Sequence, residues 1–348
     1  MKAAVLYANR DLRYEECETP VCGPGMVKVH VRATGICGSD VPRVLHNGVH
    51  FYPIILGHEF SGDVVEVGEG VTKVQVGDTV SGAPLVPCMK CADCQRGNFS
   101  LCKHYSFIGS RQNGSFADYV VIPEQNAVKY DPSISYTQAA MFEPSTVALH
   151  GLLQGNYTGG GTVAVVGGGT IGILTAQWAK IFGSKKLVIF DVDDSRLELA
   201  KRLGADAGIN TRQEGWMEKA MELTGGAGYD HVFETAGNPV TGRICFDIAA
   251  NKAHVTFIGT PHTDITFTPK QWENMNRKEF YLTGSWMSYS APFPGKEWDL
   301  TAHYFATGEL KFDPDIIFRT YPMSQAWEAF QLYDDPASVH GKVMLINE

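Results

Sequence analysis

Four cysteines lie within fifteen residues of this 348-residue chain, in the run CMKCADC and one further position after a short polar loop. They are Cys88, Cys91, Cys94 and Cys102. Two residues between successive thiols let sulfurs from one tight loop converge on a single ion, and four thiolates in a tetrahedron suit structural zinc. Because a closed four-cysteine site has no open position for a substrate, we expect this metal to hold a lobe of the fold. The search for a reactive metal therefore turns to other parts of the chain.

The remaining composition limits the cellular setting and the partners. Half of the eight cysteines sit in the metal-spaced cluster, which favours a reduced, cytoplasmic protein over a secreted disulfide protein. No run approaches the roughly 18 apolar residues of a membrane span, and residues 1–7 are typical of a first strand, not of a signal peptide. The net charge of −9 argues against a nucleic-acid-binding surface. We therefore expect a small-molecule ligand, with no nucleic acid and no membrane.

The chain is long enough for two domains, and its two parts differ in their pattern of predicted secondary structure. Short alternating strands with glycine and proline turns predict a β-barrel-like domain up to about residue 150; they cover residues 27–31, 63–67, 78–80 and 117–122. Beyond residue 160, apolar strands alternate with helix-length segments, which indicates βαβ units and a parallel sheet. These strands cover residues 163–166, 187–190, 231–233 and 255–258. A last strand, residues 342–346, is expected to return to the first domain.

A glycine-rich turn follows the strand at residues 163–166 and opens a helix-like segment, residues 173–182. This context is what dinucleotide binding requires, because the helix N-terminus offers free N–H groups to a pyrophosphate. The expected cofactor contacts in the loop are Gly167, Gly169, Thr170, Ile171 and Gly172. Asp191 ends the next strand, where its carboxylate can accept hydrogen bonds from ribose hydroxyls and repel a 2′-phosphate. NAD is therefore favoured over NADP, although Arg196 close behind could accommodate NADP.

Candidate ligands for a reactive metal lie outside the cysteine cluster. Cys37 sits in the run GICGSD, His58 and Glu59 sit in GHEFSG, and Glu143 precedes Pro144. One cysteine, one histidine and one glutamate, plus water, would give zinc an exchangeable position. The proline disfavours helical geometry at Glu143, so this glutamate is expected at an element boundary. By spacing alone, a lone cysteine is more often a small buried hydrophobe.

These motifs, in this order, resemble the zinc-dependent medium-chain alcohol and polyol dehydrogenases. The resemblance implies a mixed α/β protein: a GroES-like β-barrel catalytic domain, residues 1–148 and 286–348, around an inserted Rossmann NAD-binding domain, residues 149–285. It implies catalytic zinc on Cys37 and His58, completed by Glu59 or Glu143, and structural zinc on the four clustered cysteines. A glutamate ligand resembles the polyol and threonine branches, since the simple alcohol dehydrogenases carry a second cysteine there. By analogy, the protein is expected to be a homodimer or homotetramer.

A narrower resemblance, to a family member that oxidises a phosphorylated hexitol with NAD, is carried by residues 41–43, 51–54, 107–111, 284–289 and 294–298. A phosphorylated substrate needs cationic or N–H partners, for which Arg43, His50, Arg111 and Lys296 are candidates. Trp286 and Tyr289 are candidate pocket residues, although aromatic stretches are more often core.

One departure from the family bears on proton transfer. Many relatives carry a histidine five residues after the ligand cysteine, and here that position is Pro42. The proton relay is then expected to run through Ser39, a cofactor hydroxyl, water, or another histidine such as His46 or His50.

The expected activity is hydride transfer between NAD and a secondary hydroxyl of a polyol or polyol phosphate. Alternatives within the family are dehydrogenases of sorbitol, threonine or a simple diol. A zinc-lobe protein that binds nucleic acid or another protein is disfavoured by the acidic charge and the intact glycine loop. A zinc-free quinone reductase of the same fold is disfavoured by the metal-type residues.

Overall fold

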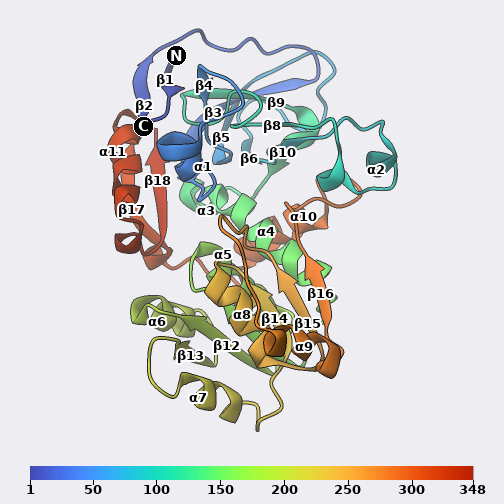
Figure 1. The fold of residues 1–348 in the computed structure, drawn as a ribbon. Coiled ribbons are helices and arrows are strands. Elements are labelled where there is room, and N and C mark those ends of the chain that lie inside the picture. Colours follow the sequence, from blue (N-terminus) through green and yellow to red (C-terminus); the bar gives the residue numbers. More distant parts are fainter. Residues whose placement is uncertain (348) are drawn as a thin grey trace. The chain divides into compact units, whose positions relative to one another are not determined.

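The computed structural model describes residues 1–347, which form two compact units (Figure 1). Unit 1 comprises Met1–Glu143, Tyr289–Gly308 and residues 314–347, and unit 2 comprises Pro144–Ser288 and Glu309–Asp313. Unit 1 is mainly antiparallel β-structure, and unit 2 is built on a parallel sheet, so the predicted α/β fold class is confirmed. Within residues 1–347, no helix is long and apolar enough to cross a bilayer.

Unit 1 contains a seven-stranded sheet in the order β10-β6-β5-β3-β18-β17, with β9 also paired to β3. Its strands are β3 (Met26–Ile36), β5 (Glu59–Val67), β6 (Thr79–Gly82), β9 (Tyr119–Pro123), β10 (Ala127–Lys129), β17 (Ile317–Pro322) and β18 (Lys342–Ile346). A three-stranded sheet joins β2 (Asp11–Glu16), β1 (Lys2–Ala8) and β4 (Ile54–Ile55), and a small ribbon joins β7 (Leu85–Val86) and β8 (Ser106–Phe107). The helices are α1 (Asp40–Pro42), α2 (Ala92–Gln95), α3 (Tyr136–Ala140), α10 (Lys296–Thr307) and α11 (Ala326–Gln331).

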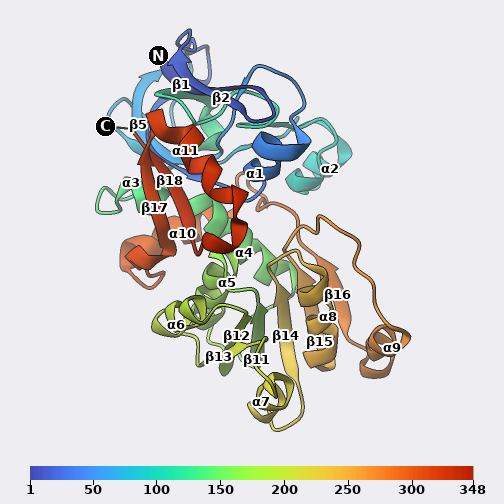
Figure 2. The ribbon, with the colours of Figure 1, turned by 60° about the vertical axis from the view of Figure 1, so that its left-hand side comes forward.

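Strand β3 is the centre of unit 1. Val27, Val29 and Val31 alternate with more exposed residues and are fully buried, as the sequence pattern predicts. They pack with Phe60 and Val64 of β5, and each buried side chain of this size contributes roughly 1.5–3 kcal/mol to folding. Strand β18 lies antiparallel to β3, on the side away from β5, so the predicted return of the C-terminal strand is confirmed. Strand β17 lies parallel to β18 on its other side (Figure 2). The core thus fixes β3 and β5, and the candidate ligands Cys37, His58 and Glu59 lie at the ends of these two strands.

Unit 2 contains six parallel strands in the order β13-β12-β11-β14-β15-β16. They are β11 (Thr162–Val166), β12 (Lys186–Asp191), β13 (Ala207–Asn210), β14 (Tyr229–Glu234), β15 (Ala249–Phe257) and β16 (Tyr281–Gly284). The helices are α5 (Thr170–Ile181), α6 (Asp194–Arg202), α7 (Trp216–Glu222), α8 (Pro239–Ile248) and α9 (Pro269–Lys278), with α4 (Phe142–Gln154) leading in from unit 1. The order reverses at β11, where a dinucleotide site is expected in such a sheet.

A ladder of stacked rings crosses three strands of unit 2. His231 of β14 stacks on His254 of β15 with ring centroids 5.2 Å apart, and His254 stacks on Tyr281 of β16 at 4.8 Å. Tyr157 also contacts His231, edge-on, with ring centroids 4.8 Å apart. Burial, with a smaller contribution from His254 and against the opposing charge of Asp230, lowers the pKa of His231 to about 4.

The low pKa of His231 predicts a loss of stability in acid. The unfolded chain takes up this proton near pH 6.5, whereas the folded chain resists it until about pH 4. Stability should therefore fall between these pH values, by about 1–2 kcal/mol after allowance for partial exposure. We expect His231→Phe to flatten the fall in melting temperature over this range, and His262→Phe, at an exposed position of unit 2, to leave it intact. If the melting temperature of His231→Phe fell with pH as steeply as that of the wild type, His231 would not be the cause of the loss of stability in acid.

Candidate catalytic metal site and cofactor loop

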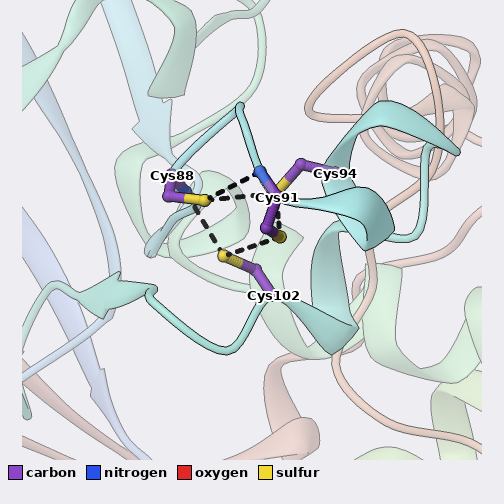
Figure 3. A group of neighbouring side chains, drawn as sticks. All are labelled: Cys88, Cys91, Cys94 and Cys102. Atoms are coloured by element: carbon purple, nitrogen blue, oxygen red, sulfur yellow. Dashed lines mark hydrogen bonds between the residues drawn. The ribbon is translucent and has the colours of Figure 1, made fainter.

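The four clustered cysteines converge in unit 1, as the sequence predicts (Figure 3). Their sulfurs all lie within 4.8 Å of one another. Cys94 is carried by α2, Cys91 precedes that helix, and Cys102 follows a short turn at Phe99–Leu101. Backbone N–H groups point at the sulfurs: Cys91 N donates to Cys88 Sγ at 3.4 Å, and Cys88 N donates to Cys102 Sγ at 3.3 Å.

This cluster fits a tetrahedral zinc ion. Zinc–sulfur bonds of about 2.3 Å place the sulfurs of a tetrahedron about 3.8 Å apart. The Sγ–Sγ distances are 4.0 Å for Cys88–Cys94, 3.5 Å for Cys91–Cys94 and 3.9 Å for Cys91–Cys102. Backbone donors, chiefly the N–H of Lys90, lower the pKa of Cys88 to about 6, which favours the thiolate that a metal needs.

A second group of donors lies where two central strands of unit 1 end and begin. Cys37, His58 and Glu59 offer ligand atoms within 4.8 Å of one another. Cys37 directly follows β3, and Glu59 begins β5 opposite Gly35 in the antiparallel register. The pairing of β3 with β5 therefore brings Cys37 together with His58 and Glu59, as the predicted site requires.

Lys342 reaches the same place from β18. Its Nζ donates to both oxygens of Glu59, at 2.8 and 2.6 Å, and to the Ile36 carbonyl at 3.2 Å. Both side chains of this ion pair are almost fully buried. Gly35 makes room for it, because a Cβ there would stand 2.3 Å from Glu59 Oε2. An isolated buried charge would be costly, and Lys342 compensates the carboxylate of Glu59 beside Cys37 and His58.

Asp40 orients the histidine. Its carboxylate is fully buried, with Oδ1 3.5 Å from His58 Nδ1 and Oδ2 accepting from the Cys37 N–H at 3.3 Å. His58 Nδ1 has no hydrogen-bond partner among the described residues, so Asp40 is a charged neighbour of the ring at this distance. Phe107 packs edge-on against the ring at 5.5 Å. A carboxylate behind a metal-binding histidine fixes the ring and its tautomer. The sequence prediction did not include Asp40 or Lys342 in the site.

The electrostatics of this group fit a divalent cation. Burial, reinforced by the negative charges of Glu59 and Asp40, raises the pKa of Cys37 to about 12. Burial also raises the pKa of Glu143 to about 8, against the favourable charge of His58. The site thus concentrates thiol and carboxylate groups whose charged forms need a nearby cation beyond Lys342. A zinc ion bound by Cys37, His58 and a glutamate meets that need.

The position of Glu143 corrects one expectation. It lies in the first turn of α4, so it stands at an element boundary as predicted, but within the helix. Pro144 is tolerated there because the first N–H groups of a helix have no intrahelical partner. Among the described residues, Glu143 is not in the group formed by Cys37, His58 and Glu59, although its pKa responds to both His58 and Glu59. Glu59 or Glu143 as third zinc ligand stays a prediction.

The predicted cofactor loop has the required geometry within unit 2. Strand β11 ends at Val166, Gly167 turns with φ +111°, and α5 begins at Thr170. Gly172 passes so close to the turn that a Cβ would meet the Gly167 carbonyl at 1.8 Å. Gly169 caps α5 without a side-chain hydrogen bond. The first N–H groups of α5, including those of Thr170 and Ile171, are therefore suited to a pyrophosphate.

Asp191 stands at the end of β12, beside this loop. Its Oδ2 accepts from the Gly168 N–H at 2.5 Å, and its Oδ1 accepts from Val192 N at 2.8 Å and Asp193 N at 3.0 Å. Arg196 Nη1 lies 3.7 Å from Oδ1. The carboxylate thus holds the glycine loop in place and presents negative charge where the adenosine ribose is expected, which favours NAD.

The candidate substrate residues have different surroundings, and none has a ligand role tested by the structure. His50, Arg111 and Lys296 are exposed on unit 1, and Trp286 is exposed on unit 2. Tyr289 is buried, stacks on Phe293, and its hydroxyl accepts from Leu85 N at 2.9 Å. Arg43 turns inward, toward Ser39 and Asp40. Ser39 Oγ donates to Cys37 Sγ at 3.3 Å.

Comparison with family models and characterised sequences agrees with this site. The alcohol dehydrogenase GroES-like domain matches residues 23–132, and the zinc-binding dehydrogenase domain matches residues 170–303. The chain is 37% identical over 323 residues to galactitol 1-phosphate 5-dehydrogenase of Escherichia coli (strain K12), covering 92% of each. It is 32% identical to sorbitol dehydrogenase of Bacillus subtilis (strain 168), covering 75% of each. It is 36% identical to L-threonine 3-dehydrogenase of Symbiobacterium thermophilum, covering 74% of each.

Solved structures give the same result. Galactitol-1-phosphate dehydrogenase from Escherichia coli has a TM-score of 0.93 at 34% identity and full coverage of both chains. A zinc-binding dehydrogenase from Sinorhizobium meliloti 1021, bound to NADP, has a TM-score of 0.90 at 29% identity over 99% of each chain. A short chain alcohol dehydrogenase from E. coli CFT073, complexed with NADH, has a TM-score of 0.88 at 29% identity, covering 100% of this chain and 99% of that one.

Proposed function

The chain belongs to the zinc-binding medium-chain dehydrogenase family, and from that membership we propose that it oxidises galactitol 1-phosphate to tagatose 6-phosphate with NAD. It is a zinc-dependent polyol or alcohol dehydrogenase. The observation that carries the proposal is the convergence of Cys37, His58 and Glu59 in a chain 37% identical to a galactitol 1-phosphate 5-dehydrogenase.

The residues of the site divide the work of this reaction. When bound, zinc supplies Lewis acidity to the substrate hydroxyl, and NAD accepts the hydride. Cys37 and His58, with Glu59 or Glu143, hold the metal. Asp40 and Lys342 fix His58 and Glu59 in place, which keeps the site preorganised.

Ser39 is the proposed first acceptor of the proton that the substrate hydroxyl loses. Its hydroxyl oxygen accepts from Arg43 Nη1, and its O–H donates to Cys37 Sγ. To pass a substrate proton onward, the Ser39 hydrogen must turn away from the sulfur. A cofactor hydroxyl, water, His46 or His50 would continue the relay, since Pro42 replaces the histidine of many relatives; His46 and His50 are both exposed.

A substrate panel tests the proposed substrate. We expect the highest kcat/KM for galactitol 1-phosphate with NAD, measured from NADH absorbance against galactitol, sorbitol and threonine, each with NAD and NADP. Sorbitol and threonine are the alternatives, because a sorbitol dehydrogenase is 32% identical to this chain and an L-threonine 3-dehydrogenase is 36% identical. A higher kcat/KM for either of them would replace the proposed substrate while leaving the zinc chemistry in place.

Arg111 is the proposed partner of the substrate phosphate. Its guanidinium is exposed and stacks 4.5 Å from the Tyr105 ring. The backbone N–H of Arg111 donates to the carbonyl of Phe107, whose ring packs on His58. Losing a charged hydrogen bond to phosphate costs about 1.5–3 kcal/mol. We expect Arg111→Ala to lower kcat/KM for galactitol 1-phosphate roughly 10- to 100-fold and to leave galactitol nearly unchanged.

Arg319 provides a matched control for Arg111. It is also an exposed arginine of unit 1 beside a tyrosine hydroxyl, with Nη1 3.3 Å from Tyr321 Oη. Arg319→Ala should change neither substrate. Equal losses on galactitol and its phosphate in Arg111→Ala would remove Arg111 from the phosphate role.

We also propose a homodimer or homotetramer. Among the described residues, β16 pairs only with β15 and leaves one edge of the six-stranded sheet open. Tyr281 and Leu282 on this strand are exposed, and an apolar groove of about 300 Å³ lined by Phe246, Phe267 and Trp272 lies beside it. An open apolar edge is a template for a second copy. A monomer in light scattering at micromolar concentration would contradict this.

A further inference from the structure

We propose that Arg43 is a positioning residue for the catalytic zinc: one guanidinium nitrogen holds both side chains that orient Cys37 and His58. This inference rests on the zinc-dependent function proposed above and assigns Arg43 a role other than binding the substrate phosphate. Two arms of contacts carry it, and both begin at Arg43 Nη1.

The first arm leads to the cysteine. Arg43 Nη1 donates to Ser39 Oγ at 3.0 Å, and Ser39 Oγ donates to Cys37 Sγ at 3.3 Å. The Ser39 N–H lies 3.5 Å from the same sulfur. Because the arginine donates to one lone pair of the hydroxyl oxygen, it favours the resting orientation in which the hydroxyl hydrogen points at the sulfur, and it leaves the hydroxyl able to turn when a proton is passed on. A hydrogen bond donated to a metal-bound thiolate fixes its direction and its charge.

The second arm leads to the histidine. Arg43 Nη1 donates to Asp40 Oδ1 at 3.1 Å, the same oxygen that lies 3.5 Å from His58 Nδ1. Asp40 Oδ2 accepts from the Cys37 N–H. The Asp40 side chain has no exposed surface, whereas that of Arg43 is 29% exposed. The arginine therefore compensates a buried carboxylate whose charge would otherwise be costly.

The local fold explains why an arginine can do this. Arg43 follows α1 and begins a π-helical turn, Arg43–Asn47, so its side chain lies over residues three and four positions earlier. The two hydrogens of one planar terminal nitrogen point apart and can serve two acceptors at once. Lys342, the buried cation of the site, donates from its ammonium to Glu59 and to the Ile36 carbonyl. Arg43 is thus the cation that contacts Asp40 directly.

Removing the contacts of Arg43 should weaken binding of the zinc ion at Cys37 and His58 and leave the zinc ion of the four cysteines bound. Loss of an outer partner of a metal ligand typically costs 10- to 100-fold in metal affinity. In Arg43→Ala we expect the site of Cys37 and His58 to bind zinc 10- to 100-fold more weakly, as measured by competition with a chelator. The four-cysteine zinc should be retained. With Co²⁺ in the catalytic site, the visible spectrum should shift. The ratio of kcat/KM for galactitol 1-phosphate to that for galactitol should not change.

Two further variants complete the test. Arg43→Lys restores the charge and should recover much of the zinc affinity, which also keeps the test informative if Arg43→Ala folds poorly. Arg13→Ala removes an exposed arginine that pairs with Asp11 in unit 1 and should change nothing. Unaltered zinc affinity and Co²⁺ spectrum in Arg43→Ala would overturn the proposal, as would a loss confined to the phosphorylated substrate. A wild-type protein holding only the four-cysteine zinc would instead reject the proposed function.

Discussion

Replacing Cys37 by serine is expected to remove the catalytic zinc and about 10³-fold or more of the turnover, while the fold survives. The metal contributes several kcal/mol of charge stabilisation in the transition state, and each 1.36 kcal/mol is a factor of ten in rate. Cys37 directly follows β3, and the remaining donors, His58 and Glu59, are contacted by Asp40 and Lys342. Zinc content by mass spectrometry and steady-state rates with galactitol 1-phosphate measure the two effects together.

Cys245→Ser is the matched control, because Cys245 is a buried cysteine of unit 2, packed among apolar residues of α8. It should keep both zinc ions and most of the turnover. Full activity in a Cys37→Ser protein that holds only the structural zinc would reject the catalytic role of this metal.

Replacing Cys91 by serine should have the opposite pattern: a large loss of stability and a smaller direct effect on the chemistry. A structural zinc contributes folding energy, because the unfolded chain has no preformed site. The Cys91 sulfur lies 3.5 Å from that of Cys94 and 3.9 Å from that of Cys102, so its loss opens the tetrahedron. We expect the melting temperature to fall by about 10 °C or more, measured by circular dichroism.

The two cysteine variants check each other. Each should hold one zinc per chain, Cys37→Ser the structural ion and Cys91→Ser the catalytic ion. At temperatures where Cys91→Ser remains folded, it should retain turnover that Cys37→Ser lacks. A Cys91→Ser protein as stable as the wild type would show that the cluster does not support unit 1.

The sites that sequence could predict are those in which local spacing fixes geometry. The four cysteines are close in the chain, so their separations alone bring the sulfurs within 4.8 Å. The glycine loop is similar, since strand, turn and helix follow one another from Thr162 to Ile181. Cys37 and His58 were grouped by family resemblance, and the pairing of β3 with β5 confirms their proximity.

What sequence could not predict depends on contacts distant in the chain. Lys342 begins an otherwise apolar strand, 283 positions from the Glu59 that it pairs with, and no local pattern links the two. Asp40 is only three residues from Cys37, and the need of a metal-bound histidine for a carboxylate could have identified it. Strands β13 and β16 were missed because they are short edge strands without clear alternation, held by pairing with β12 and β15.

The most direct test of the account is anomalous diffraction at the zinc edge from crystals of the wild-type protein. We predict two peaks per chain: one among the four clustered cysteines, and one about 2.3 Å from Cys37 Sγ and about 2.0–2.1 Å from a ring nitrogen of His58. A zinc-loaded crystal with a peak at the cluster alone, and none beside Cys37 and His58, would contradict the proposed catalysis.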